Sequence, residues 1–280
     1  MKHFKWLALI AAAVFAIGFV ACSADSDGSS SDDKTTKAYT APLTTVITYI
    51  GTKAPSEAKA VGDIVFSDGS ATPYTSELTL TNEQKSKAVA VIFYAGSASD
   101  TLGAKTLGVG LKNATGSGNT LAWAKYDVNG YSTNITAIQC TPSDMGGGKA
   151  ATAGFPGDKD GSDNWQALCK AVSDEGTSGN YPAWEWVNAY ATENSLAGSY
   201  ANGWYLPTLA ELSMLYRVKG TVNSALKKAG GTKIADASYW SSSQVASLET
   251  RAFYVRFGDG GLFSDIKSYG GCSVCTVRAF

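Results

Sequence analysis

Histidine is almost absent from this sequence. The one histidine among 280 residues is His3, close to the N-terminus. Histidine is the usual general base of Ser-His and Cys-His nucleophile pairs, and it ligates many zinc ions and haems. Carboxylates and lysines remain, so an enzyme is not excluded. Binding is nevertheless a better expectation than catalysis, and the sequence predicts no cofactor.

An excess of positive charge is also missing. The chain has 23 Lys and Arg against 24 Asp and Glu, a formal net charge of −1. Nucleic-acid-binding domains carry a basic patch or stripe, and none is evident here. The sequence therefore predicts no nucleic-acid partner.

One long apolar run is present, from Trp6 to Ala21. It follows Lys2 and Lys5, the charged-then-apolar order of a secretory signal, and it is too short for an ordinary membrane-spanning helix. The run ends in Phe-Val-Ala-Cys at residues 19–22, which resembles a relaxed lipobox. We expect residues 1–21 to be a lipoprotein signal peptide and Cys22 to be lipidated. An uncleaved anchor helix is the alternative.

The composition changes sharply after Cys22. Residues 22–40 are rich in Ser, Asp, Thr and Lys, which bury too little apolar surface to fold, and they predict a flexible tether. Residues 41–280 are long enough for one globular domain. The sequence therefore predicts an exported monomer, anchored by lipid in the outer membrane and facing the cell surface.

Four cysteines follow Cys22, and an exported protein commonly pairs them. They allow three disulfide pairings, among which the sequence does not choose. The Cys272-Ser-Val-Cys275 spacing also suits a redox or zinc pair, although no second ligand pair is near. The four are Cys140, Cys169, Cys272 and Cys275.

Hydrophobic patterning predicts an α+β fold with short antiparallel strands and two to three helices. Thr208 with Glu211 forms a capping box at a helix start, and Asp163 is a second candidate cap. Strands are expected at 44–50, 62–67, 88–95, 107–111, 121–124, 239–243, 251–257 and 274–280. The patterned helices are expected from Asp163, at 181–194 and from Thr208, besides a short polar helix after Thr81.

Alternation in the strand at 251–257 sorts its side chains onto two faces. Phe253, Val255 and Phe257 share one face, while Tyr254 and Arg256 point the other way. Gly258-Asp-Gly-Gly261 follows as a turn. Exposed aromatic and Arg side chains are common anchors of binding surfaces, so the second face is a candidate ligand surface.

Three further motifs carry a family resemblance: Gly-Trp-Tyr-Leu-Pro-Thr at 203–208, Tyr-Trp-Ser-Ser-Ser-Gln at 239–244 and Val-Arg-Ala-Phe at 277–280. Together they resemble C-type-lectin-fold domains of the formylglycine-generating-enzyme type, and more narrowly the variable proteins of diversity-generating retroelements. The resemblance covers about residues 61–280. It implies a C-terminal variable region at about 238–280, in which adenines of an RNA template are randomised.

That mechanism makes a test of residue types possible. An asparagine codon altered only at its two adenines cannot become Lys, Gln, Glu, Met or Trp. Between Val245 and Ser273 only Glu249 and Lys267 lie outside the reachable set, and Lys267 falls where the family has a fixed lysine. The variable, ligand-binding positions implied are Val245, Ser247, Leu248, Arg251, Tyr254, Arg256, Gly258, Asp259, Gly261, Leu262, Phe263, Ser264, Asp265, Ile266, Ser268, Tyr269, Gly270, Gly271 and Ser273.

Two other groups of residues have chemical potential. Asp158, Asp160 and Asp163 have the alternating oxygen ligands that suit calcium, but their glycine spacing departs from an EF-hand loop, and a solvated turn is the preferred interpretation. Trp184 and Trp186 have the flat rings that stack on sugars, while helical spacing favours one buried and one exposed ring. Trp204 and Trp240 lie inside the family motifs and are expected to be structural.

The resemblance implies a non-enzymatic, surface-displayed lipoprotein that binds a protein or glycan ligand on another cell or on a host. Two alternatives stay open. One is a cysteine oxidase like the formylglycine-generating enzymes, although the residues around Cys272 and Cys275 do not match that active site. The other is a structural envelope lipoprotein without diversification.

Overall fold

A computed structural model describes residues 49–280, except residue 117 and residues 173–178. The predicted signal peptide, Cys22, the tether and most of the strand expected at 44–50 lie outside the described residues. In the part of the chain that is described, no helix has the length and apolar character needed to cross a membrane.

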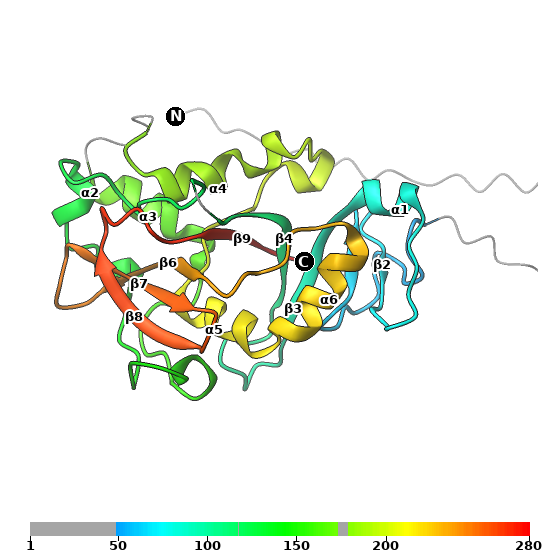
Figure 1. Cartoon of the computed structure of the whole chain (residues 1–280), viewed down its shortest axis with the longest axis horizontal. Coiled ribbons are helices and arrows are strands. Elements are labelled where there is room, and N and C mark those ends of the chain that lie inside the picture. Colours follow the sequence, from blue (N-terminus) through cyan, green and yellow to red (C-terminus); the bar gives the residue numbers. More distant parts are fainter. Residues whose placement is uncertain (1–48, 117, 173–178) are drawn as a thin grey trace, which may run out of the picture. The chain divides into compact units, whose positions relative to one another are not determined.

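The fold is mixed α+β and contains two sheets (Figure 1). The first sheet is antiparallel and has the strand order β2-β1-β3-β4-β9, so the C-terminal strand pairs with one from the first half of the chain. Its strands are β1 (Ile64–Phe66), β2 (Ala71–Thr72), β3 (Ala88–Ala95), β4 (Thr106–Ala114) and β9 (Val274–Ala279).

The second sheet has the order β5-β6-β7-β8, in which only the β5–β6 pair is parallel. A parallel bridge between Tyr239 and Ser273 links its second strand to the segment entering β9. The C-terminal residues therefore hold the two sheets together. The strands of this sheet are β5 (Gln139–Cys140), β6 (Ser238–Val245), β7 (Arg251–Arg256) and β8 (Gly261–Ile266).

The described residues form six α-helices rather than the two or three expected from patterning. The additional long helix is α6, whose apolar stripe of Val222, Leu226 and Ala229 is buried. The helices are α1 (Asn82–Lys87), α2 (Asn129–Ser132), α3 (Asn164–Ala171), α4 (Pro182–Glu193), α5 (Leu209–Arg217) and α6 (Lys219–Ala229); 3-10 turns occupy Thr136–Ile138, Lys149–Ala151, Gly161–Asp163 and Gly198–Ala201.

Local sequence determines several element boundaries as expected. β3 spans the predicted residues 88–95, and Thr208 and Glu211 form the predicted capping box of α5. Thr81 caps α1 in the same way with Gln84. The strand expected at 121–124 is wrong, because Leu121 makes a single bridge to Cys272 and no ladder follows.

The largest core cluster lies between the sheets and the pair α5–α6. It joins Phe93 of β3 and Leu212 of α5 to Val255 of β7, all buried. A second cluster packs α3 and α4 against Trp123 and Trp240. On the outer face of the second sheet this cluster covers Trp240 and Ala252, whereas Arg256 at the end of β7 is exposed.

Candidate functional site

The β7–β8 hairpin presents two different faces. Phe253, Val255 and Leu262 point inward, and each is at most 4% exposed. Tyr254 and Phe263 lie opposite each other on the outward face, where Arg256 is exposed. The alternation predicted from the sequence is confirmed, because neighbouring side chains on a strand point to opposite faces.

The turn between β7 and β8 is shaped by a close approach of Gly260 to α5. Gly260 has φ +69°, and a Cβ there would lie 2.5 Å from the Tyr216 ring. The Ala150 amide donates a hydrogen bond to the Gly260 carbonyl at 2.9 Å. A larger residue would have to displace the Tyr216 ring and would be strained at this positive φ, so glycine suits the close contact between the turn and α5.

We call Tyr254, Arg256, Asp259, Phe263 and Asp265 the hairpin face. The Arg256 guanidinium lies 4.6 Å from the Phe263 ring centroid and donates two hydrogen bonds to Asp259, at 2.8 and 2.5 Å. The Tyr254 and Phe263 ring centroids are 5.9 Å apart. Aromatic and charged groups are thus arranged side by side in solvent, as on many binding surfaces.

The ion pair on the hairpin face remains charged over the physiological pH range. The hydrogen bonds from Arg256 lower the pKa of Asp259 to about 2, and the carboxylate raises the pKa of Arg256. Burial raises the pKa of Tyr254, whose ring is perpendicular to Trp240 at 5.8 Å. The face therefore offers a fixed pair of charges beside a neutral aromatic surface.

A buried lysine lies beneath the surface segment that follows β8. The Lys267 side chain is fully buried; its Nζ donates to the Gly130 carbonyl at 2.6 Å and lies 4.6 Å from the Trp123 ring centroid. Burial lowers the pKa of Lys267 to about 7. Lys267 therefore belongs to the interior of the scaffold. An asparagine codon cannot become lysine, which excludes Lys267 from the variable positions but does not indicate that its side chain is buried.

Most of the implied variable positions reach the surface, but three do not. Leu262 is 0% exposed and packs in the largest core cluster. Ser273 is buried and its hydroxyl pairs with Thr115 at 2.9 Å, while Gly261 is buried beneath the Phe263 ring. These three implied positions belong to the scaffold instead, because a buried residue does not reach a ligand at the surface.

The remaining sixteen positions are exposed or half-buried. Leu248, Ile266 and Tyr269 are 48%, 39% and 46% exposed, three of the seven large apolar side chains that are exposed in the described chain. They lie in the turn between β6 and β7, at the end of β8 and in the segment that follows it. The exposed members are Ser247, Leu248, Arg256, Gly258, Asp259, Ile266, Tyr269, Gly270 and Gly271, and the half-buried ones are Val245, Arg251, Tyr254, Phe263, Ser264, Asp265 and Ser268.

The aspartates suggested as calcium ligands are engaged otherwise. Asp158 accepts from the Asn164 side chain at 2.7 Å, and Asp160 pairs with Lys105 at 2.6 Å. Asp163 precedes α3 but makes no side-chain cap; Asp160 caps the 3-10 turn before it. Over the described residues, no three acidic, Cys or His side chains are grouped to hold a metal.

The Cys272–Cys275 motif is divided between two core clusters. Cys272 packs with Trp123 and Trp240, whereas Cys275 lies in the cluster with Val277 on the other side. Burial raises the pKa of both thiols, and that of Cys140, to about 12. Because reactive and metal-binding cysteines act as thiolates, this geometry does not make a redox or zinc pair.

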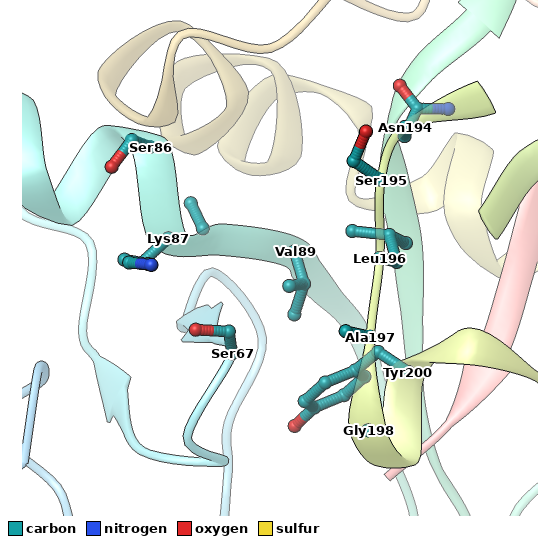
Figure 2. Close-up of a pocket in the computed structure, with 11 residues that line it drawn as sticks. Ser67, Ser86, Lys87, Val89, Asn194, Ser195, Leu196, Ala197, Gly198 and Tyr200 are labelled. Carbon is teal, nitrogen blue, oxygen red and sulfur yellow. The ribbon is translucent and has the colours of Figure 1, made fainter. Parts of the chain in front are cut away.

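A cavity of about 460 Å³ lies elsewhere, between the start of β3 and the segment after α4. Figure 2 shows Ser67, Ser86 and Lys87 on one side and Ser195, Leu196 and Tyr200 on the other. None of the residues singled out from the sequence lines it. Lys87 is its one charged lining residue, so it has little charge with which to select a ligand.

No family model and no curated protein matches this chain. Its structure is similar to the crystal structure of a fimbrial protein from Bacteroides ovatus, with a TM-score of 0.53 and 14% sequence identity. The match covers 79% of this chain and 49% of the fimbrial protein. This chain therefore spans about half the length of the protein it matches, and the likeness concerns the fold alone.

Proposed function

We propose that this protein is a surface-displayed binding protein with a C-type lectin fold of the formylglycine-generating-enzyme type. Its hairpin face and the adjoining exposed residues of 245–273 are diversified by a retroelement and contact a variable ligand. The mixed α+β arrangement with two sheets supports this assignment at the level of fold class. The lectin-type fold itself is inferred from the motifs at 203–208, 239–244 and 277–280.

The observation that carries the proposal is the exposure of the implied variable positions, of which sixteen of nineteen are exposed or half-buried. On β7 and β8 these positions occupy both faces, and Arg251, Ser264 and Ile266 lie at the partly exposed end of the inward face. Phe253 and Val255 were not among those positions, and both are buried. Lys267, which an asparagine codon cannot reach, is buried with its ammonium group satisfied. A surface of this kind changes its side chains without changing its scaffold.

The proposed ligand is a protein or glycan on another cell or on a host. The hairpin face combines an Arg–Asp pair with Tyr254 and Phe263, which suits a polar macromolecular surface better than a small apolar ligand. The proposed setting is a lipid anchor at Cys22 in the outer membrane, a tether at 22–40 and a monomeric domain. No nucleic acid, cofactor or catalytic step is part of the proposal.

A structural envelope lipoprotein is the second candidate. The solved protein with a similar fold is named a fimbrial protein, which favours a surface location but would not require diversification. The oxidase alternative has less support, because Cys272 and Cys275 lie in different core clusters.

Sequencing this locus in sister isolates separates the two candidates. Diversification predicts substitutions confined to residues 245–273, at adenines of asparagine template codons, and concentrated on exposed positions such as Tyr254, Arg256 and Phe263. Residues 88–116, a control segment of equal length, should stay constant. Equal drift in both segments would contradict diversification and favour the structural lipoprotein.

A further inference from the structure

A buried tyrosine lines the cavity of about 460 Å³ between the start of β3 and the segment after α4. Tyr200 is only 6% exposed, so its ring belongs to the interior. In Figure 2 the ring extends from the segment after α4, and its hydroxyl oxygen points toward the side of the cavity on which Ser67 lies. We call this cavity the Tyr200 cavity. It shares no residue with the hairpin face.

The Tyr200 hydroxyl lacks the partner that the fold supplies to the other buried tyrosines. The Tyr200 hydroxyl forms no hydrogen bond within the described chain. The side-chain atoms that are both enclosed and unpaired there are Trp184 Nε1 and Arg278 Nε, so the Tyr200 hydroxyl is accessible from the cavity that it lines. Hydrogen bonds of 2.9–3.3 Å engage the hydroxyl groups of Tyr181, Tyr190, Tyr205 and Tyr239.

The position of this hydroxyl is fixed by the contacts of its ring and backbone. The Arg278 guanidinium lies 4.9 Å from the Tyr200 ring centroid, and the Phe280 ring centroid is 5.9 Å away. The Trp204 indole donates to the Tyr200 carbonyl at 2.8 Å. Burial raises the pKa of Tyr200, so its hydroxyl is neutral and both donates and accepts. A ligand therefore meets a group that is already in place, which lowers the entropic cost of binding.

The remaining lining residues indicate the chemistry of the occupant. Ser67 and Ser195 add exposed hydroxyl groups, while Val89 and Leu196 add apolar surface. Lys87 is exposed and takes part in none of the ion pairs of the described residues. No acidic side chain lines the cavity. The occupant that this lining suits has hydroxyl groups, a C–H surface and one negative charge.

A phosphate ion matches the lining less well. Proteins bind phosphate with arginine forks, clustered cations or a helix N-terminus, and the Tyr200 cavity has one lysine as its only charged residue. A single exposed cation selects weakly, so hydroxyl groups must supply most of the recognition. The cavity volume also falls within the roughly 300–1,000 Å³ of sites for larger organic ligands.

We propose that the Tyr200 cavity binds a saccharide ring that carries a carboxylate, such as a uronic acid unit. The Tyr200 hydroxyl bonds to a ring hydroxyl, the ring C–H groups lie on Val89 and Leu196, and the carboxylate lies near Lys87. This site goes beyond the hairpin face and does not depend on its diversification.

The test uses the full-length protein in detergent with ¹³C-labelled tyrosine rings. The chain has 14 tyrosines, and loss of one signal in Tyr200→Phe assigns the Tyr200 resonance. Glucuronate and galacturonate are titrated at millimolar concentrations, with glucose, galactose and inorganic phosphate in parallel. We expect at least one uronate to shift the Tyr200 signal saturably, and to bind more tightly than its neutral counterpart. Calorimetry gives the dissociation constants.

Two variants test the two polar contacts. Tyr200→Phe removes only the hydroxyl and should weaken uronate binding about tenfold, the value of one hydrogen bond. Its thermal stability should stay at the wild-type value, because that hydroxyl has no partner in the described chain. Lys87→Ala should weaken uronate binding about threefold and remove the preference over the neutral sugar.

Matched controls are available for both variants. Lys85→Ala removes a lysine of the same helix that does not line the cavity. Tyr126→Phe removes a hydroxyl from an exposed tyrosine that does not line the cavity. Both should bind the uronate as the wild type does.

Four results would overturn the proposal. The first is that neither uronate shifts the Tyr200 signal. The second is phosphate binding that is tighter than that of both uronates. The third is equal binding of the acidic and neutral sugars. The fourth is uronate binding that survives Tyr200→Phe and Lys87→Ala but is lost in Arg256→Ala, which would move the sugar to the hairpin face.

Discussion

The inner and outer faces of the β7–β8 hairpin share two strands and one hydrogen-bond ladder, yet their side chains are packed differently. On the inner face, Phe253 and Val255 fill a close-packed core in which a lost atom leaves a void. On the outer face, Arg256 and Phe263 touch each other and solvent. The difference shows that one segment combines side chains fixed by close packing with side chains that packing leaves largely free.

The largest expected difference between the faces comes from one adjacent pair of residues. Phe253→Ala should lower the free energy of unfolding by roughly 3–5 kcal/mol, because it opens a cavity in the core. Tyr254→Ala should cost only about 1 kcal/mol, since the ring is half-buried and loses contacts with Trp240 and Phe263. Urea denaturation of both variants measures the contrast. Equal losses of unfolding free energy in the two variants would contradict the distinction between the faces.

The second prediction concerns charge on the scaffold side. Glu211 is completely buried and accepts hydrogen bonds from Tyr205 and Thr208, and burial raises its pKa to about 7. Between its ordinary pKa of 4.5 and pH 7 the folded state binds more protons than the unfolded state. Stability should therefore fall as pH rises through that window, by about 3 kcal/mol.

Glu211→Gln tests this dependence. Glutamine also completes a capping box, so the variant should fold, and it does not titrate. The unfolding free energy of the variant should lack the contribution of Glu211 titration. The unfolding free energy of the wild type minus that of the variant should therefore fall as pH rises from 4.5 to 7. A difference that stays constant with pH would show that Glu211 is ionised at an ordinary pKa.

Several of these features could be predicted from sequence and others could not. The run at 88–95 and the Thr208–Glu211 box are local patterns, and both elements formed as expected. β8 was not predicted, because Gly261–Ile266 gains its alternation only by pairing with β7. α6 was missed since its isolated sequence favours helix weakly, and its buried stripe becomes stabilising only in the core.

The candidate sites likewise include features that the sequence predicts and features that it does not. The two faces of 251–257 follow from the period of a strand, which the sequence shows directly. The burial of Leu262 and Ser273 depends on partners at Gly146 and Thr115, distant in sequence. The cavity of about 240 Å³ lined by Trp165, Trp184 and Trp204 joins residues from three separate segments, so no spacing rule indicates it.

A smaller effect is expected at the border between the faces. A Cβ at Gly261 would lie 2.3 Å from the Phe263 ring, which is the movable end of a side chain. Gly261→Ala should therefore displace that ring and cost about 1 kcal/mol, without unfolding the hairpin. Denaturation together with Phe263 ring chemical shifts tests it. Global unfolding would instead show that the core requires glycine at residue 261.

The smallest effect is expected on the outer face itself. Arg256 and Asp259 form an exposed ion pair, and such pairs contribute little to stability. Arg256→Ala and Asp259→Ala should each unfold at the wild-type denaturant concentration, in low and in high salt. A clear loss of stability in either variant would assign the pair to the scaffold rather than to a replaceable surface.

A complete substitution scan of residues 245–273 in the full chain tests the central claim most directly, with protease resistance as the measure of folding. The account predicts that most substitutions at Tyr254, Arg256 and Phe263 leave the protein folded. Polar substitutions at Phe253, Val255 and Leu262 should abolish resistance. Equal sensitivity of the two sets would contradict a variable face carried on a constant scaffold.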